Sequence, residues 1–142
     1  MTDDARTATA HETVQGGDVV ELRLPADGAY LSVLRTATAG LAARLDFTLD
    51  EIEDLRIAVD EACAMLLPDA VEGGDLSCLF TLTENALVVS VSVPTTDGRL
   101  PSRDTFAWTV LNALAGEVDA AADENDRVTI TMTKKRGGAG LL

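Results

Sequence analysis

Apolar and polar residues alternate in four stretches of the chain, and this period of two predicts β-strands. The first stretch is VVELRLP, which Pro25 ends. The second and third, Leu76 to Thr83 and Ala86 to Val93, are separated by only Glu84-Asn85, which predicts a hairpin. The fourth is RVTITMTKK. The positions expected to face a core are Val20, Leu22, Leu24, Leu87, Val89, Val91, Val93, Val128, Ile130 and Met132.

Apolar residues recur at helical spacing between the first two strands. A first helix is predicted from Ala29 to Leu45, with Asp27 as its N-cap. Thr48 and Glu51 have the spacing of a capping box, which predicts the start of a second helix that Pro68 ends. The predicted core stripe of the first helix is Tyr30, Val33, Leu34, Ala37, Leu41 and Leu45, and that of the second is Ile52, Leu55, Val59, Ala62 and Leu66.

A third helix is predicted between the hairpin and the last strand, with Asp104 as its cap. Its apolar positions are Phe106, Val110, Ala113, Leu114 and Val118. The resulting order of strands and helices predicts an α/β fold, a two-layer sandwich with a mixed, mostly antiparallel sheet and helices on one face. The domain is expected to span 18–135, between a disordered segment at 1–17 and a flexible tail at 136–142.

Composition and charge narrow the classes of partner. The chain has 142 residues, enough for one domain, and only 4% aromatic residues, so the core must be built from Ala, Val and Leu. The formal net charge of −13 disfavours direct binding to nucleic acid or to an anionic membrane surface. The same charge would attract a basic protein partner, although solubility alone also accounts for it.

Metal binding and membrane insertion are not expected. Cys63, Cys78 and His11 do not have metal-ligand spacing, and the two cysteines are expected to be buried free thiols. No stretch is apolar enough for a membrane span, and the first residues lack the apolar centre of a signal peptide. The expected location is the cytoplasm.

The second predicted helix, DEIEDLRIAVDEACAML, resembles the segment that carries the ATP site in the bacterial anti-sigma factors of the GHKL ATPase family. The resemblance is closest to members that act as serine kinases on small anti-anti-sigma proteins, and it extends from Asp18 to Lys135. It implies a GHKL fold. In the family this helix carries a catalytic Glu and, one turn later, an Asn that binds Mg²⁺. Glu61 stands at the first position and Met65 at the second.

The resemblance breaks at three ATP motifs. A thioether at Met65 is a poor ligand for Mg²⁺, which prefers hard oxygen ligands; filling the core is the alternative role. The family's Asp-x-Gly-x-Gly run is reduced to Asp97-Gly98, which we expect to be a turn. The glycine motif before the last long helix is replaced by a stretch in which Phe106 and Trp108 would crowd a triphosphate.

These losses predict a protein that binds neither ATP nor Mg²⁺ and has no kinase activity, with Glu61 as a vestige. The alternative is an active serine kinase of the same family with a rearranged ATP site. A third possibility is a regulator that binds another ligand in the remodelled pocket.

The remaining activity is then expected at a protein surface on the first predicted helix. The face opposite its core stripe is small and nearly uncharged, as docking surfaces often are; its residues are Leu31, Arg35, Thr38, Ala39 and Ala42. Arg35 aligns with an Arg that in the family contacts both the sigma factor and the anti-anti-sigma protein, although a solvated Arg is the plain alternative. The resemblance thus implies sequestration of an alternative sigma factor, release by partner switching, and a possible homodimer.

Overall fold

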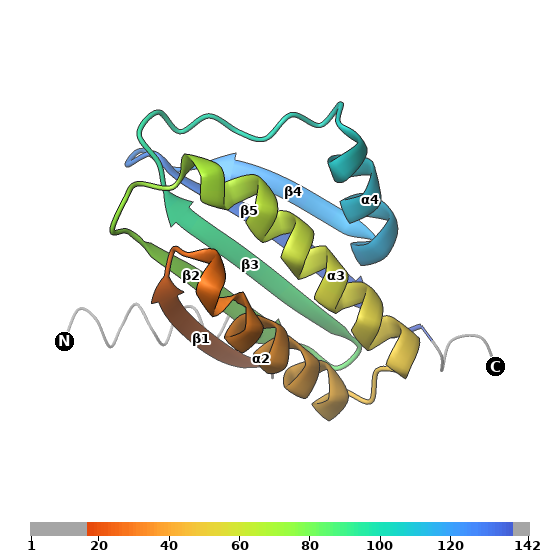
Figure 1. Cartoon of the computed structure of the whole chain (residues 1–142). Coiled ribbons are helices and arrows are strands. Elements are labelled where there is room, and N and C mark those ends of the chain that lie inside the picture. The colour runs from red at the N-terminus through yellow and green to blue at the C-terminus, as the bar shows by residue number, and fades with distance from the viewer. Residues whose placement is uncertain (1–16, 138–142) are drawn as a thin grey trace.

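The computed structural model describes residues 17–137, and Figure 1 shows the arrangement of their helices and strands. Residues 1–16 and 138–142 lie outside the described part of the chain; they include His11 and most of the predicted disordered segment (1–17) and flexible tail (136–142). The elements in chain order are β1 (Asp18–Pro25), η1 (Gly28–Tyr30), α2 (Leu31–Arg44), α3 (Leu49–Leu66), η2 (Leu67–Asp69), β2 (Asp75–Leu82), β3 (Ala86–Pro94), α4 (Phe106–Ala115), β4 (Glu117–Ala122) and β5 (Arg127–Lys135).

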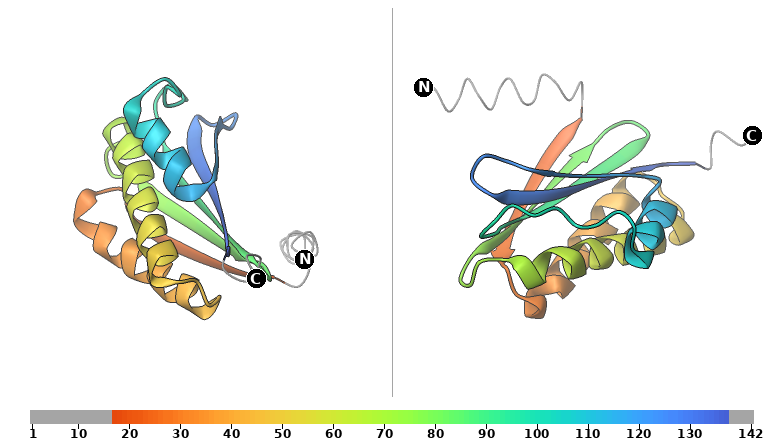
Figure 2. Two further views of the ribbon diagram at one scale, coloured as in Figure 1. Left: turned by 90° about the vertical axis from the view of Figure 1, so that its right-hand side faces the viewer. Right: turned by 90° about the horizontal axis from the view of Figure 1, so that it is seen from above.

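The strands form one five-stranded sheet in the order β1-β2-β3-β5-β4. Each neighbouring pair is antiparallel, so within the described residues the sheet contains no parallel pair of the kind that a mixed sheet would include. Helices α2, α3 and α4 cover one face, and the opposite face carries none of the described helices (Figure 2). The predicted two-layer α/β sandwich is confirmed.

The core lies between the sheet and the helices. It is dominated by aliphatic residues and includes Phe80, Ile130 and Met132 from the strands and Leu34, Leu55 and Leu111 from the helices. Cys63 and Cys78 are free and buried as expected. Burial raises the pKa of the Cys63 thiol to about 12 and that of Cys78 further still, so both thiols stay protonated and behave as small apolar side chains.

Strand β4 is absent from the prediction, which carried the third helix through to Val118. Helix α4 instead ends at Ala115, because Gly116 adopts a φ of 97° that turns the chain back along β5. In β4, Val118 and Ala120 pair with residues of β5, and their side chains turn toward the core. The alanines of β4 favour a helix, and for this reason the sequence pattern did not predict this short edge strand. The cap of α4 is also corrected: Thr105, rather than Asp104, accepts a hydrogen bond from the amide of Trp108.

Helix α2 is rotated about its axis relative to the prediction. Tyr30 and Val33, which were expected in the core, are exposed, and Thr38 and Ala42, which were expected on the surface, are fully buried. The Thr38 hydroxyl donates to the Leu34 carbonyl at 2.8 Å, and this bond satisfies its polar group inside the core. Sequence spacing alone does not fix the rotation of such a helix about its axis, because small residues such as alanine are compatible with both the buried and the exposed face.

The predicted start of α3 is confirmed. Thr48 accepts from the Glu51 amide at 3.1 Å, and Glu51 accepts from the Thr48 amide at 2.8 Å, which together form the capping box. The Gly137 amide also donates to Glu51, at 2.8 Å, and so joins the end of the described chain to this helix. Burial alone would raise the pKa of Glu51, but the hydrogen bonds from Thr48 and Gly137 outweigh it and lower the pKa below its ordinary value.

Candidate functional site

The segment that resembles the ATP-site helix of the GHKL family lies on α3, which packs between α2 and α4 (Figure 1). Glu61 and Met65 are four residues apart, so they lie on the same side of α3 one turn from each other. Glu61 is half-buried, and Met65 packs against the hydrophobic core. This contact gives Met65 a packing role at the position that the resemblance assigns to the family's Mg²⁺-binding Asn.

Asp97 and Gly98 form a turn in the connection between β3 and α4. The Asp97 carboxylate accepts from the Arg99 amide at 3.1 Å, and this bond, together with the Arg99 charge, lowers the pKa of Asp97. Gly98 has a φ of 65°, and a Cβ there would lie 2.7 Å from Oδ1 of Asp126. The Gly98 amide donates to Thr95, whose hydroxyl donates to the Asp126 carbonyl. The Asp-Gly pair therefore fastens this connection to the β4–β5 turn.

The two aromatic residues at the start of α4 lie in different environments, which corrects the expectation that they act together as a block. Phe106 is 82% exposed, whereas Trp108 is only 4% exposed and belongs to the core. They differ because residues two apart on a helix point in different directions. The Arg103 guanidinium lies 4.9 Å from the centre of the Trp108 ring and pairs with Asp119 at 2.8 Å. Arg103 thus joins the loop before α4 to β4.

The predicted partner surface on α2 is only partly present in the structure. Thr38 and Ala42 are buried and cannot touch a partner, which corrects their assignment. Leu31 and Ala39 are half-buried, and Leu31 packs against the core. Arg35 does reach the surface. The exposed side of the helix is instead formed by Ser32, Val33, Thr36, Gly40 and Ala43.

Arg35 is held by a residue that sequence reasoning missed. Its Nε donates to Oδ1 of Asp60 on α3 at 2.9 Å, and the Arg35 side chain remains 37% exposed. Helices α2 and α3 are adjacent and antiparallel (Figure 1). Arg35 and Asp60 are 25 positions apart, so no local spacing in the sequence indicates the pair. The pair forms because α2 is rotated about its axis so that Arg35 faces Asp60 on α3.

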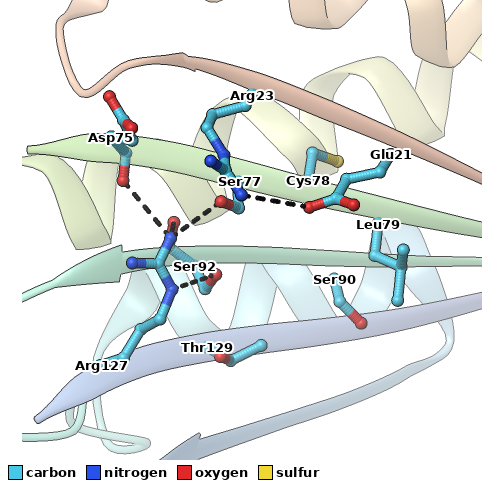
Figure 3. Close-up of a pocket in the computed structure, with 10 residues that line it drawn as sticks. All are labelled: Glu21, Arg23, Asp75, Ser77, Cys78, Leu79, Ser90, Ser92, Arg127 and Thr129. Atoms are coloured by element: carbon cyan, nitrogen blue, oxygen red, sulfur yellow. Dashed lines mark hydrogen bonds and ion pairs between the residues drawn. The ribbon is translucent and has the colours of Figure 1, made fainter. Parts of the chain in front are cut away.

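A hollow of about 740 Å³ lies on the sheet face opposite the helices (Figure 3). Arg127 crosses its floor from β5: Nε donates to the Ser92 hydroxyl at 2.9 Å, and Nη2 donates to the Ser77 hydroxyl at 3.0 Å. Sequence reasoning predicted the polar face but named none of its residues as a site. The available signal was the serine and threonine alternation of β2, β3 and β5.

Comparison with known proteins finds relatives that are similar to this chain in sequence. The Bacillus subtilis protein named serine-protein kinase RsbW is 38% identical over 78 residues, which make up 53% of this chain and 49% of that protein. RsbW of Bacillus thuringiensis is 36% identical over 75 residues, 51% of this chain and 47% of the relative. The chain is similar to the RsbW serine-protein kinases. The resemblance expected from the sequence is confirmed, although the chain spans only about half the length of these RsbW relatives.

The fold agrees with that resemblance. The crystal structure of the RsbU and RsbW domains of Rv1364c from Mycobacterium tuberculosis superposes with a TM-score of 0.64. The match covers 83% of this chain and 32% of that one, at 15% identity, and so shows a shared fold. No protein-family profile matches the chain.

Proposed function

We propose that this protein is an anti-sigma factor that sequesters an alternative sigma factor and releases it when an anti-anti-sigma protein competes for the same surface. The observation that carries the proposal is the placement of Arg35. Resemblance assigns this residue to the shared partner surface, and the α2–α3 pairing leaves it at the protein surface. Similarity to the RsbW kinases supports the kind of partner.

The geometry of Arg35 suits recognition of a carboxylate. Its bond to Asp60 uses Nε, and the guanidinium makes no other hydrogen bond within residues 17–137. Both terminal nitrogens can therefore form the paired contact with a partner's carboxylate that an Arg fork makes and a Lys cannot. Asp60 restrains the side chain beforehand, which reduces the entropy lost on binding.

The proposed protein has no kinase activity of its own and binds neither ATP nor Mg²⁺. Three features support this part: the Met65 thioether packed on the core, the Asp97-Gly98 turn bonded to Thr95 and Arg99, and a glycine-free start of α4. Each replaces a different contact that the family makes to ATP-Mg. Control of release would then come from the concentration or modification of the competitor.

The setting proposed for this exchange is the cytoplasm, with neither nucleic acid nor membrane as a direct partner. None of the helices in residues 17–137 is long and apolar enough to cross a membrane. The net charge of −13 favours a partner with a basic surface around the carboxylate that Arg35 binds. A homodimer is part of the proposal through the resemblance.

Calorimetry with purified partners tests the proposal. Each alternative sigma factor of the source organism would be titrated into the protein, first alone and then with an anti-anti-sigma protein present. We expect one sigma factor to bind and the competitor to displace it. Arg35→Ala should weaken both interactions, whereas Arg44→Ala, on the same helix at its last turn, should leave them unchanged. Absence of any sigma factor binding would contradict the proposal.

The second candidate is an active serine kinase, which the name of the RsbW relatives and the presence of Glu61 favour. Titration with ATP-Mg separates the two candidates directly. The noncatalytic protein gives no binding heat and transfers no phosphate to a small anti-anti-sigma protein. Micromolar ATP binding, or phosphate transfer that Glu61→Gln abolishes, would establish the kinase instead.

A further inference from the structure

The open face of the sheet carries a row of polar residues that lie side by side across four strands. Arg23 of β1 pairs in register with Ser77 of β2, Ser77 with Ser92 of β3, and Ser92 with Thr129 of β5. Residues paired in this way have neighbouring side chains on one face of the sheet. Arg127 lies two residues before Thr129 and therefore shares that face. All five line the hollow shown in Figure 3.

The charge of Arg127 is held by neutral groups. Its Nε and Nη2 donate to the hydroxyls of Ser92 and Ser77, and Nη2 also approaches the carbonyls of Ser92 and Asp75. Within residues 17–137 no carboxylate lies at ion-pairing distance from this guanidinium. A half-buried cation without an acidic partner leaves a local positive potential in a protein that is acidic as a whole.

The two serines are oriented by Arg127. Because each hydroxyl oxygen accepts a hydrogen bond from the guanidinium, each retains its own proton for donation. Ser77 also lies beside Arg23, which reaches over from the neighbouring strand (Figure 3). Two hydroxyl donors are thus placed between two guanidinium groups, an arrangement that suits an oxyanion.

The nearby carboxylates do not fill this position. Glu21 lies 3.7 Å from Arg23, and both side chains are well exposed, so the pair is weak and can open. The Asp75 carboxylate points away from Arg127 in Figure 3, and only its backbone carbonyl faces the guanidinium. Repulsion from the remaining acidic residues is screened over about 8 Å at physiological salt.

We propose that this hollow is a binding site for the phosphoryl group of a small phosphate ester. The group would sit over the Ser77 and Ser92 hydroxyls, between Arg23 and Arg127. A phosphoryl dianion matches two guanidinium groups better than a carboxylate, which carries a single charge. The volume of about 740 Å³ falls within the range of small-molecule sites and leaves room for the rest of an ester.

Titration followed by amide NMR shifts tests the site. Inorganic phosphate and phenyl phosphate would be added at constant ionic strength, with acetate as the monoanionic comparison. Both phosphates should give saturable shifts at the amides of Arg23, Ser77 and Ser92, and acetate should bind more weakly. Arg127→Gln and Arg23→Gln should each raise the Kd for phosphate at least about tenfold, because each removes a charge-assisted contact.

The matched control is Arg56→Gln, which removes an equivalent charge from an exposed ion pair on α3, in the opposite layer, and should leave the Kd unchanged. If Arg127→Gln disturbs the fold, Arg23→Gln carries the test, because its side chain is largely exposed. Unsaturable shifts, an unchanged Kd in Arg23→Gln, or acetate binding as tight as phosphate would overturn the proposal. Tighter binding of a phosphoserine peptide than of phenyl phosphate would assign the site to a protein partner and overturn the small-molecule assignment.

Discussion

The two faces of the sheet are made by the same strands and yet have opposite characters. In β2, β3 and β5 every second residue enters the core, among them Phe80, Val91 and Ile130, and these side chains are fully buried under the helices. The residues between them are mostly serine and threonine, and they form the open face with Arg127. One face stabilises the domain by apolar burial, and the other presents polar groups that are bonded to one another and reach solvent.

This difference shows where polar chemistry can remain available. On the helix-covered side, the positions that the resemblance assigns to ATP contacts already make contacts within the protein: Met65 packs on the core, and Asp97 and Gly98 are hydrogen-bonded to residues of their own loop. On the open side, Arg127 bonds to serines that keep donors for a ligand. A family motif at a position is therefore weaker support for a site than the contacts its side chain makes.

The largest expected effect comes from adjacent residues of β2 that face opposite ways. Phe80→Ala should lower the free energy of unfolding by about 3–5 kcal/mol, because it leaves a cavity beneath the helices. Leu79→Ala, on the open face where the side chain is 40% exposed, should cost less than about 1 kcal/mol. Urea denaturation measures both. Equal losses would show that the open face is covered in solution.

Much of this two-faced sheet could be predicted from alternation, because a strand buried on one side has a side-chain period of two. Turn and cap signals likewise predicted the hairpin and the capping box of α3. Strand β4 was missed because its alanines favour a helix. The end of α4 depends on the positive φ of one residue, Gly116, and a periodic pattern does not reveal such a feature. Helix α2 was misoriented because its small residues fit either a surface or a close helix contact.

The site could be predicted less well than the fold. The resemblance led to Glu61, Met65 and Arg35, yet the bonds that restrain Arg35 and Arg127 join residues far apart in the sequence. A spacing argument works within one element, whereas these contacts depend on how elements pack. Sequence could indicate which residue types were present but not which of them would meet.

The second prediction asks how much the open face contributes to stability. Arg127→Ala removes charged hydrogen bonds that link β5 to β3 and β2, and it should lower the free energy of unfolding by about 1–2 kcal/mol. The loss stays below that of Phe80→Ala because the serines left behind can bond to water. Denaturation of Thr131→Ala, a neutral neighbour on the same face, provides the control. A loss as large as that of Phe80→Ala would contradict a binding role for this face.

The third prediction concerns the polar contacts at the N-terminal end of α3, in the helix layer. Thr48→Ala should cost about 1 kcal/mol through loss of the α3 cap. The pKa of Glu51 is lower in the folded state than in the unfolded state, so its contribution is complete above the unfolded pKa and is lost as pH falls through the folded pKa. Glu51→Gln should therefore flatten the acid side of the stability profile. A profile unchanged by Glu51→Gln would exclude this contact as the cause.

The smallest expected effect lies where the helix-covered face meets solvent, at Trp108. Arg103 stacks over the indole and pairs with Asp119, but both charged side chains are more than half exposed, so Arg103→Ala should cost only about 0.5–1 kcal/mol. Because the substitution opens one side of the ring to water, Trp108 emission should shift to longer wavelength. Arg99→Ala, in the same loop and without a ring to cover, should leave the emission unchanged. If Arg103→Ala also leaves the emission unchanged, the core alone shields Trp108 from water. The change from buried to exposed side chains would then lie between Trp108 and Phe106.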